Sequence, residues 1–138
     1  MEKFFIFIGD NFVAVLLLFF FIILLIIYES RKGGKKLDSS ELTRVINKDN
    51  PLVYDLRSSS EFDSGTISGA KNIAPENVHK GNVLFKANES DKVVLLCKTG
   101  SSSKTVGVKL IKEGYKDINI LNGGLMSWIQ QGLPLSKN

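Results

Sequence analysis

Residues 93–104 read Val-Val-Leu-Leu-Cys-Lys-Thr-Gly-Ser-Ser-Ser-Lys, an apolar run followed directly by a loop of small residues. The run is typical of a buried strand, and the residues after the loop have the pattern of a helix. A strand that passes through a tight loop into a helix presents several unpaired backbone N–H groups and the positive end of the helix dipole. The sequence therefore predicts an anion-binding loop with Cys97 at its start.

Cys97 is the only cysteine of the chain, and it has two interpretations. A free cysteine beside an apolar run is often a small core residue. A thiolate on an anion-binding loop would instead be stabilised by the loop N–H groups, which favours a nucleophile. One cysteine and one histidine, His79, cannot build an internal disulfide or a Cys/His zinc site, so we expect no structural metal.

Alternating strand and helix patterns continue on both sides of this stretch. Strands are expected at residues 52–56, 92–96 and 117–121, an extended segment at 67–73, and helices at 58–62, 102–113 and 125–131. Ser39 or Ser40 should cap one more helix, and Pro75 should start a turn or helix towards Phe85. Strands separated by helices predict an α/β domain whose mostly parallel sheet is flanked by helices. Ligands bind such a sheet at the carboxyl ends of its strands, where Cys97 is expected.

The N-terminus carries a long apolar segment. Residues 12–28 contain no charge, and a second apolar patch covers residues 4–8. As one helix, residues 4–28 would extend roughly 37 Å, enough to cross a hydrocarbon core of about 30 Å. A cleaved signal peptide is disfavoured, because the first residues carry little positive charge, the apolar stretch is too long and no A-x-A-like site follows. We therefore expect a retained transmembrane helix that contacts the bilayer through residues 4–28.

Four basic residues follow this segment directly, namely Arg31, Lys32, Lys35 and Lys36. Positive charge flanks the cytoplasmic end of a span, which predicts a single-pass protein of the plasma membrane with its N-terminus outside and its C-terminal domain in the cytoplasm. A patch for anionic lipids is the alternative interpretation of the cluster. The formal net charge of +4 equals the charge of the cluster, so nothing indicates a nucleic-acid partner.

These observations divide the chain into three parts. Residues 1–30 are the expected transmembrane helix, residues 31–37 a linker rich in basic residues and glycine, and residues 38–138 a domain of about 100 residues. A domain of that length can build one hydrophobic core.

Three ordered groups of residues resemble the signatures of the rhodanese-like (sulfurtransferase) domain family. The first group is Tyr54-Asp55-Leu56-Arg57, Glu61-Phe62, Gly65-Thr66-Ile67, Gly69-Ala70, Asn72-Ile73 and Pro75. The last group is Asn122-Gly123-Gly124, Trp128 and Gly132-Leu133-Pro134, and the Cys97 loop falls between the two. The resemblance covers residues 37 to about 136. With one N-terminal span, the chain also resembles membrane-anchored single-domain bacterial members of that family.

The resemblance implies a rhodanese-like fold and a sulfurtransferase activity at the bacterial inner membrane. It implies that Cys97 takes sulfur from a sulfane donor as a persulfide and passes it to a thiol or another nucleophile, with no metal or organic cofactor. The substrate-binding loop would be formed by Lys98, Thr99, Gly100, Ser101 and Ser102. Asp55 and Arg57 are expected to support the site structurally, because a charged residue at the end of a buried strand usually forms an internal ion pair.

The chain departs from the family pattern at several positions. Lys98 and Ser102 stand where many active members carry arginine, which predicts a less cationic pocket and slow use of thiosulfate. Thr66 replaces the usual histidine, and Ser103 occupies the place of the arginine in the longer phosphatase loop, which disfavours phosphatase chemistry. Two alternatives therefore stay open: a scaffold that binds membrane protein partners, and a thiol redox or sulfur-carrier role.

Overall fold

The computed structural model describes residues 1–30 and 32–137. These residues fall into two units, one ending at Lys32 and the other beginning at Gly33. Arg31, the first residue of the basic cluster, lies outside the described residues. The domain boundaries drawn from the sequence stay a prediction.

The N-terminal unit consists of two helices, α1 (Glu2–Asp10) and α2 (Phe12–Ser30). The expected single helix over residues 4–28 is interrupted at Asn11, whose backbone N–H and side-chain amide both donate to the Phe7 carbonyl. Residues 12–29 have a mean hydropathy of 3.0, and none of them is buried. The 19 residues of α2 extend about 28 Å, so this helix is compatible with a single-pass membrane anchor.

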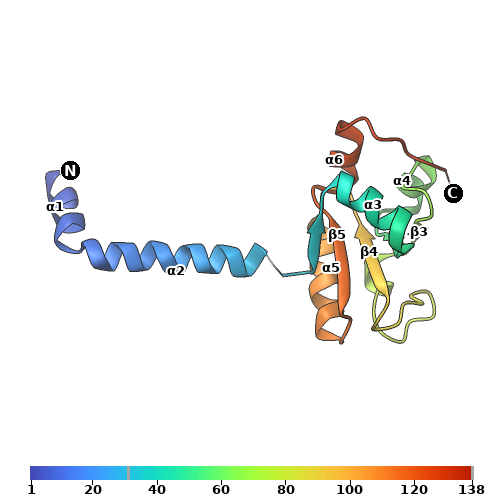
Figure 1. The fold of residues 1–138 in the computed structure, drawn as a ribbon, viewed down its shortest axis with the longest axis horizontal. Helices are drawn as coiled ribbons and strands as arrows, with labels where there is room; N and C mark the ends of the chain where they lie inside the picture. Colours follow the sequence, from blue (N-terminus) through green and yellow to red (C-terminus); the bar gives the residue numbers. More distant parts are fainter. Residues whose placement is uncertain (31, 138) are drawn as a thin grey trace. The chain divides into compact units, whose positions relative to one another are not determined.

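The second unit is built on a five-stranded sheet in the order β1-β5-β4-β2-β3, and every neighbouring pair in it is parallel (Figure 1). The strands are β1 (Lys35–Leu37), β2 (Leu52–Asp55), β3 (Lys71–Asn72), β4 (Lys92–Leu96) and β5 (Asp117–Leu121). This sheet confirms the predicted α/β fold with a parallel sheet. The strand that ends at the Cys97 loop, β4, lies in its centre.

Strand β1 lies inside the segment that the sequence suggested was a linker. Lys36 pairs with Ile120 of β5, and Leu37 is buried. Gly34 makes this pairing possible, because a Cβ atom there would come within 2.4 Å of the Ile118 carbonyl oxygen. A three-residue strand with two lysines gives no hydrophobic alternation, so its signal is absent from the sequence.

The remaining elements of this unit are α3 (Ser39–Asp49), α4 (Ser59–Ser64), the 3-10 helix η1 (Pro75–Asn77), α5 (Ser101–Lys112) and α6 (Gly124–Gln130). The expected N-cap residue of α3, Ser39 or Ser40, was wrong by one or two positions. Asp38 caps this helix, because its carboxylate accepts the Glu41 N–H while the Glu41 carboxylate accepts the Asp38 N–H. This reciprocal capping box satisfies two terminal donors at once.

Helices and loops cover both faces of the sheet, and the strand residues alternate between two cores. On one face, Val93, Leu95 and Cys97 of the β4 segment pack with Val106 and Leu110 of α5. The other core receives the intervening strand residues and is covered by α3, α4 and α6; its members include Leu42, Phe62, Val94, Leu96, Leu125 and Trp128. The central strand is thus buried on both sides, and its carboxyl end opens into the Cys97 loop.

Candidate active site

Cys97 immediately follows β4 and continues its alternation of side chains. The residue is 4% exposed and belongs to the core on the α5 face. Its Sγ accepts the Gly100 N–H over 2.9 Å, so the loop folds back onto the sulfur. Both interpretations of the sequence therefore describe real contacts, since the thiol packs in the core and also faces a backbone donor.

Helix α6 fixes the orientation of the first two peptide groups of the loop. The Leu125 N–H donates to the Cys97 carbonyl over 2.9 Å, and the Met126 N–H donates to the Lys98 carbonyl over 3.1 Å. In a trans peptide the N–H points away from the carbonyl. The N–H groups of Lys98 and Thr99 therefore point away from α6, where an anion on the loop can meet them.

The loop ends at the start of α5. Gly100 is the N-cap residue with a φ of 97°, and the 12-residue helix begins at Ser101. The side chains of Lys98, Thr99, Ser101 and Ser102 are exposed, and Lys98 forms no ion pair within residues 1–30 and 32–137. The first turn of a helix carries unsatisfied N–H groups and partial positive charge. The arrangement can hold an anion next to Cys97, with one cationic side chain nearby.

A cleft of about 220 Å³ adjoins the outer side of this loop. It is lined by Lys36, Thr99, Gly100, Ser101, Lys104, Ile120, Leu121, Asn122 and Gly123. Lys36 and Lys104 thus come close to the predicted substrate loop. From the sequence, Lys36 was expected only to belong to the basic cluster that follows the membrane span. The position of Lys36 beside the loop could not be predicted from the sequence, because it depends on the pairing of β1 with β5.

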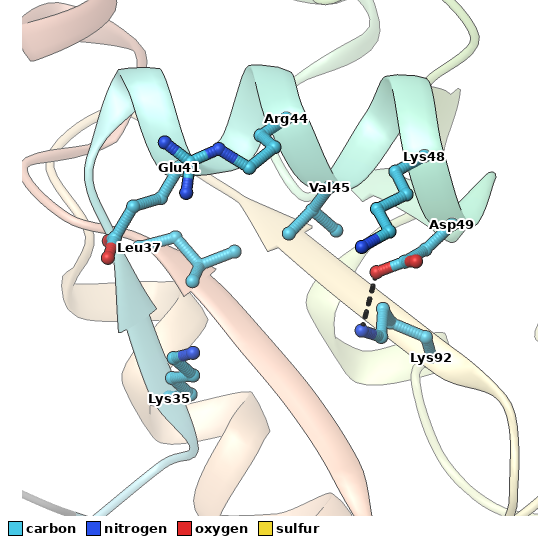
Figure 2. Close-up of a pocket in the computed structure, with 8 residues that line it drawn as sticks. All are labelled: Lys35, Leu37, Glu41, Arg44, Val45, Lys48, Asp49 and Lys92. Atoms are coloured by element: carbon cyan, nitrogen blue, oxygen red, sulfur yellow. Dashed lines mark hydrogen bonds and ion pairs between the residues drawn. The ribbon is translucent and has the colours of Figure 1, made fainter.

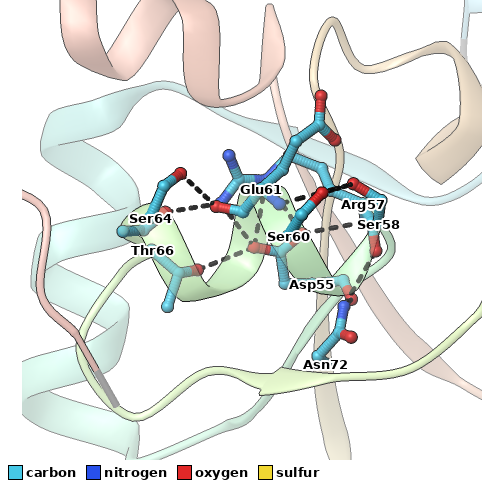
Figure 3. Close-up of polar contacts among 9 residues, drawn as sticks. Asp55, Arg57, Ser58, Ser60, Glu61, Ser64, Thr66 and Asn72 are labelled. Atoms are coloured by element: carbon cyan, nitrogen blue, oxygen red, sulfur yellow. Dashed lines mark hydrogen bonds and ion pairs between the residues drawn. The ribbon is translucent and has the colours of Figure 1, made fainter.

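A second polar group occupies the carboxyl end of the neighbouring strand β2. Asp55 is fully buried, and its backbone pairs in register with Leu96, the residue before Cys97. Figure 3 shows Arg57 and Thr66 directed at the Asp55 carboxylate. Arg57 donates through Nε at 3.1 Å and Nη2 at 2.8 Å, and the Thr66 hydroxyl donates to Oδ2 at 2.8 Å.

The same network joins several segments of the domain. Arg57 also donates to the Gly65 carbonyl over 2.7 Å, and the Asn72 side chain donates to the carbonyls of Asp55 and Arg57. Thr66 exchanges two backbone hydrogen bonds with Ser136 near the C-terminus. Since protein donors occupy both oxygens of Asp55, its geometry is that of a structural ion pair. Its support of the Cys97 site stays a prediction.

Comparison with known proteins gives a consistent result. The rhodanese-like domain family matches residues 38–131 of this chain. The uncharacterized protein YibN of Escherichia coli K12 is 31% identical over 102 residues, which cover 73% of this chain and 71% of YibN. The thiosulfate sulfurtransferase GlpE of Shewanella oneidensis is 28% identical over 94 residues, covering 68% of this chain and 91% of GlpE.

A solved structure agrees with the fold. The human single-domain sulfurtransferase TSTD1 superimposes on this chain with a TM-score of 0.63. It shares 22% sequence identity, and the alignment covers 72% of this chain and 98% of that protein. The similarity therefore extends over the second unit and supports the same architecture.

The Asp55 network should dominate the stability of the domain. We expect Asp55→Asn to lower the free energy of unfolding by about 3 kcal/mol, because it removes the partner of a buried guanidinium. Thr66→Val should cost about 2 kcal/mol, since one donor to a buried carboxylate is lost. Urea unfolding of the full chain in detergent, followed by the fluorescence of Trp128, measures both. Ser60→Ala on the exposed side of α4 is the control, and equal losses in all three variants would contradict the expectation.

Gly124 should be required for the contact between α6 and the Cys97 loop. A Cβ atom at this position would come within 2.4 Å of the Lys98 oxygen and 2.6 Å of the Cys97 oxygen. Gly132 has a similar left-handed φ, 73° against 65°, but open space around it. Gly132→Ala should therefore cost only the backbone strain of about 1–2 kcal/mol. Gly124→Ala should lower the free energy of unfolding by about 2 kcal/mol more than Gly132→Ala in the same experiment. Equal losses of stability in the two variants would show that the close approach of α6 to the Cys97 loop does not require glycine.

Proposed function

The chain belongs to the rhodanese-like domain family, and from this premise we propose that it is a membrane-anchored sulfurtransferase that carries sulfane sulfur as a persulfide on Cys97. The observation that carries the proposal is the Gly100 N–H directed at the Cys97 Sγ over 2.9 Å. A donor in this position stabilises a thiolate before sulfur is taken up. The neighbouring N–H groups of the loop then stabilise the negative charge of the outer sulfur.

In the first step the Cys97 thiolate attacks the sulfane sulfur of the donor. A new S–S bond forms at Sγ while the old bond of the donor breaks, and the leaving group departs with the bonding electron pair. With thiosulfate this leaving group is sulfite, so two negative charges leave and one stays on the outer persulfide sulfur. The N–H groups of Lys98, Thr99 and the first turn of α5 face this charge in the proposed complex.

In the second step an acceptor thiolate attacks the outer sulfur. The S–S bond at Cys97 breaks, and the Cys97 thiolate is released with its electron pair. The acceptor leaves as a persulfide, so the two steps involve no net oxidation and require no cofactor. Lys98 is the cationic side chain of the loop itself, and Ser102 adds no charge. A donor less dependent on positive charge than thiosulfate, such as a glutathione persulfide, therefore fits this site better.

The proposed location is the bacterial inner membrane, with α2 as the anchor. Lys32, Lys35 and Lys36 lie on the C-terminal side of α2, and this charge bias favours a cytoplasmic C-terminal domain. The cytoplasm keeps an unpaired thiol reduced, as sulfur transfer through Cys97 requires. In this proposal residues 1–30 anchor the chain, and the domain of residues 38–138 performs the transfer.

Sulfur loading tests the proposed reaction. The purified full chain is exposed to thiosulfate or to glutathione persulfide, and its mass is measured under non-reducing conditions. We expect one added sulfur on the wild-type chain, faster with glutathione persulfide, and none on Cys97→Ser. A later addition of a small thiol should remove the added sulfur.

Thr105→Ala on the exposed side of α5 is the matched control and should load like the wild type. Absence of the adduct with both donors would contradict both the transferase and the sulfur-carrier role. If Cys97→Ser still restored the phenotype of a deletion strain, a scaffold that binds membrane protein partners would replace the proposal. In a scaffold, Cys97 would serve only as a buried core residue, which its burial also fits. Sulfur loading distinguishes this core role from the proposed transfer of sulfur.

The proposed orientation has its own test. Green fluorescent protein or alkaline phosphatase is fused after the last residue of the chain in a bacterial host. We expect fluorescence and no phosphatase activity, because the phosphatase needs disulfides that form only outside the cytoplasm. A fusion lacking residues 1–30 should be fluorescent and soluble, which controls for the anchor. Phosphatase activity of the full-length fusion would reverse the orientation.

A further inference from the structure

A second cleft lies away from the Cys97 loop, between α3, β1 and the first residue of β4 (Figure 2). Its volume is about 260 Å³, and its lining consists of Lys35, Leu37, Glu41, Arg44, Val45, Lys48, Asp49 and Lys92. One water molecule takes about 30 Å³ of the liquid, so a phosphate group fits this space. Lys92 begins β4 and Cys97 follows its end, so about 16 Å of strand separates the two places.

The charges of this cleft are unequal, with four cationic side chains against two carboxylates. Both carboxylates already have donors. Glu41 accepts the Asp38 N–H over 3.0 Å within the capping box, and Asp49 accepts the Lys92 Nζ over 2.8 Å. This hydrogen bond from Lys92 lowers the pKa of the Asp49 carboxyl from its ordinary value.

Lys48 also approaches the Asp49 carboxylate, and its positive charge helps to lower the pKa of that group, whereas Lys35 and Arg44 face no such partner among the described residues. Lys35, Arg44 and Lys48 form no ion pair with any residue in the described part of the chain. They belong to separate elements, with Lys35 on β1 and the other two on α3. Figure 2 shows Lys48 and Lys92 reaching towards the Asp49 carboxylate, while Lys35 lies on β1 away from this group. The fold thus gathers an excess of positive charge around a cleft, which a bound anion would neutralise.

The chain itself indicates which anion is close at hand. Lys35 follows Glu29, the last residue of the apolar helical window, by six residues. A fully extended chain of that length spans at most about 20 Å, so the linker between the two units is short. Anionic phospholipids of the cytoplasmic leaflet attract basic residues that come within a Debye length, about 8 Å, of the surface, and a linker of this length lets Lys35 come that close.

We propose that the cleft between α3 and β1 binds the phosphate group of an anionic phospholipid, through Lys35, Arg44 and Lys48. The proposal rests on the membrane anchor of the proposed function but not on the chemistry of Cys97. Arg44 supplies a planar pair of donors for phosphate oxygens, and the two lysines supply point charges. Leu37 and Val45 add an apolar wall to the cleft. Bound in this way, the domain would be held at the bilayer surface by a second contact besides the span.

Lysine acetylation of the full chain in lipid nanodiscs tests this proposal. The rates at Lys35 and Lys48 are measured by mass spectrometry in discs of phosphatidylcholine, with and without phosphatidylglycerol. We expect both lysines to react more slowly in the anionic discs, and Lys109 and Lys112 of α5 to react equally in both. Arg44→Gln or Lys48→Gln should reduce the protection of Lys35 about fivefold each. The matched controls Lys109→Gln and Lys112→Gln remove the same charge from α5 and should leave that protection unchanged.

Several outcomes would overturn the proposal. Equal rates at Lys35 in the two kinds of disc would exclude a lipid site, and equal protection of all four lysines would indicate diffuse attraction only. Protection by inorganic phosphate in purely zwitterionic discs would assign the cleft to a soluble phosphate. A chain that fails to enter the discs would refute the anchor on which the proposal rests. Labelling of the Cys97→Ser chain separates the lipid site from the proposed sulfur transfer. This variant cannot load sulfur, but anionic lipid should protect its Lys35 as in the wild-type chain.

Discussion

The second unit depends on the compensation of one buried charge, the carboxylate of Asp55. A buried charge is costly unless it is paired and hydrogen bonded. Asp55 meets this condition only when Arg57 and Thr66 reach it from the chain that follows β2. Arg57 in turn holds the Gly65 carbonyl at the end of α4, and Thr66 holds the C-terminal segment at Ser136. One charge therefore fixes the turn after β2, helix α4 and the end of the chain in a single arrangement.

This arrangement borders the loop that carries the thiol. Asp55 and Leu96 are partners in the sheet, and the Leu56 N–H donates to the Leu96 carbonyl. On the opposite side, α6 donates to the carbonyls of Cys97 and Lys98. The start of the loop is thus held from β2 and from α6 at once. The N–H groups of Lys98 and Thr99 point away from α6 and have no acceptor in the described part of the chain, and this makes the carboxyl edge of the sheet suited to an anion.

Much of this architecture could be predicted from local patterns. The bounds of β4 and β5 match the expected strands at 92–96 and 117–121, because both are apolar runs bounded by loop residues. Features that depend on distant partners could not be predicted in this way. Strand β1 exists because Lys36 pairs with Ile120, and the break at Asn11 depends on a side-chain amide bonded to the preceding turn. Of the turn or helix expected from Pro75 towards Phe85, the structure contains only the 3-10 turn η1, since Val78 and Phe85 enter the core from irregular chain.

The same limit applied to the candidate site. The thiol, its loop and the glycines at 123 and 124 follow one another in recognisable motifs, whereas Lys36 and Lys104 reach the outer side of the loop only in the folded sheet. The burial of Cys97 was one of the two interpretations of the sequence, and it also agrees with the proposed chemistry. A persulfide adds a second sulfur about 2 Å beyond Sγ, next to the exposed residues Lys98 and Thr99. In the proposed mechanism the core would then shield Sγ while the outer sulfur faces the acceptor, so attack would fall on the atom to be transferred.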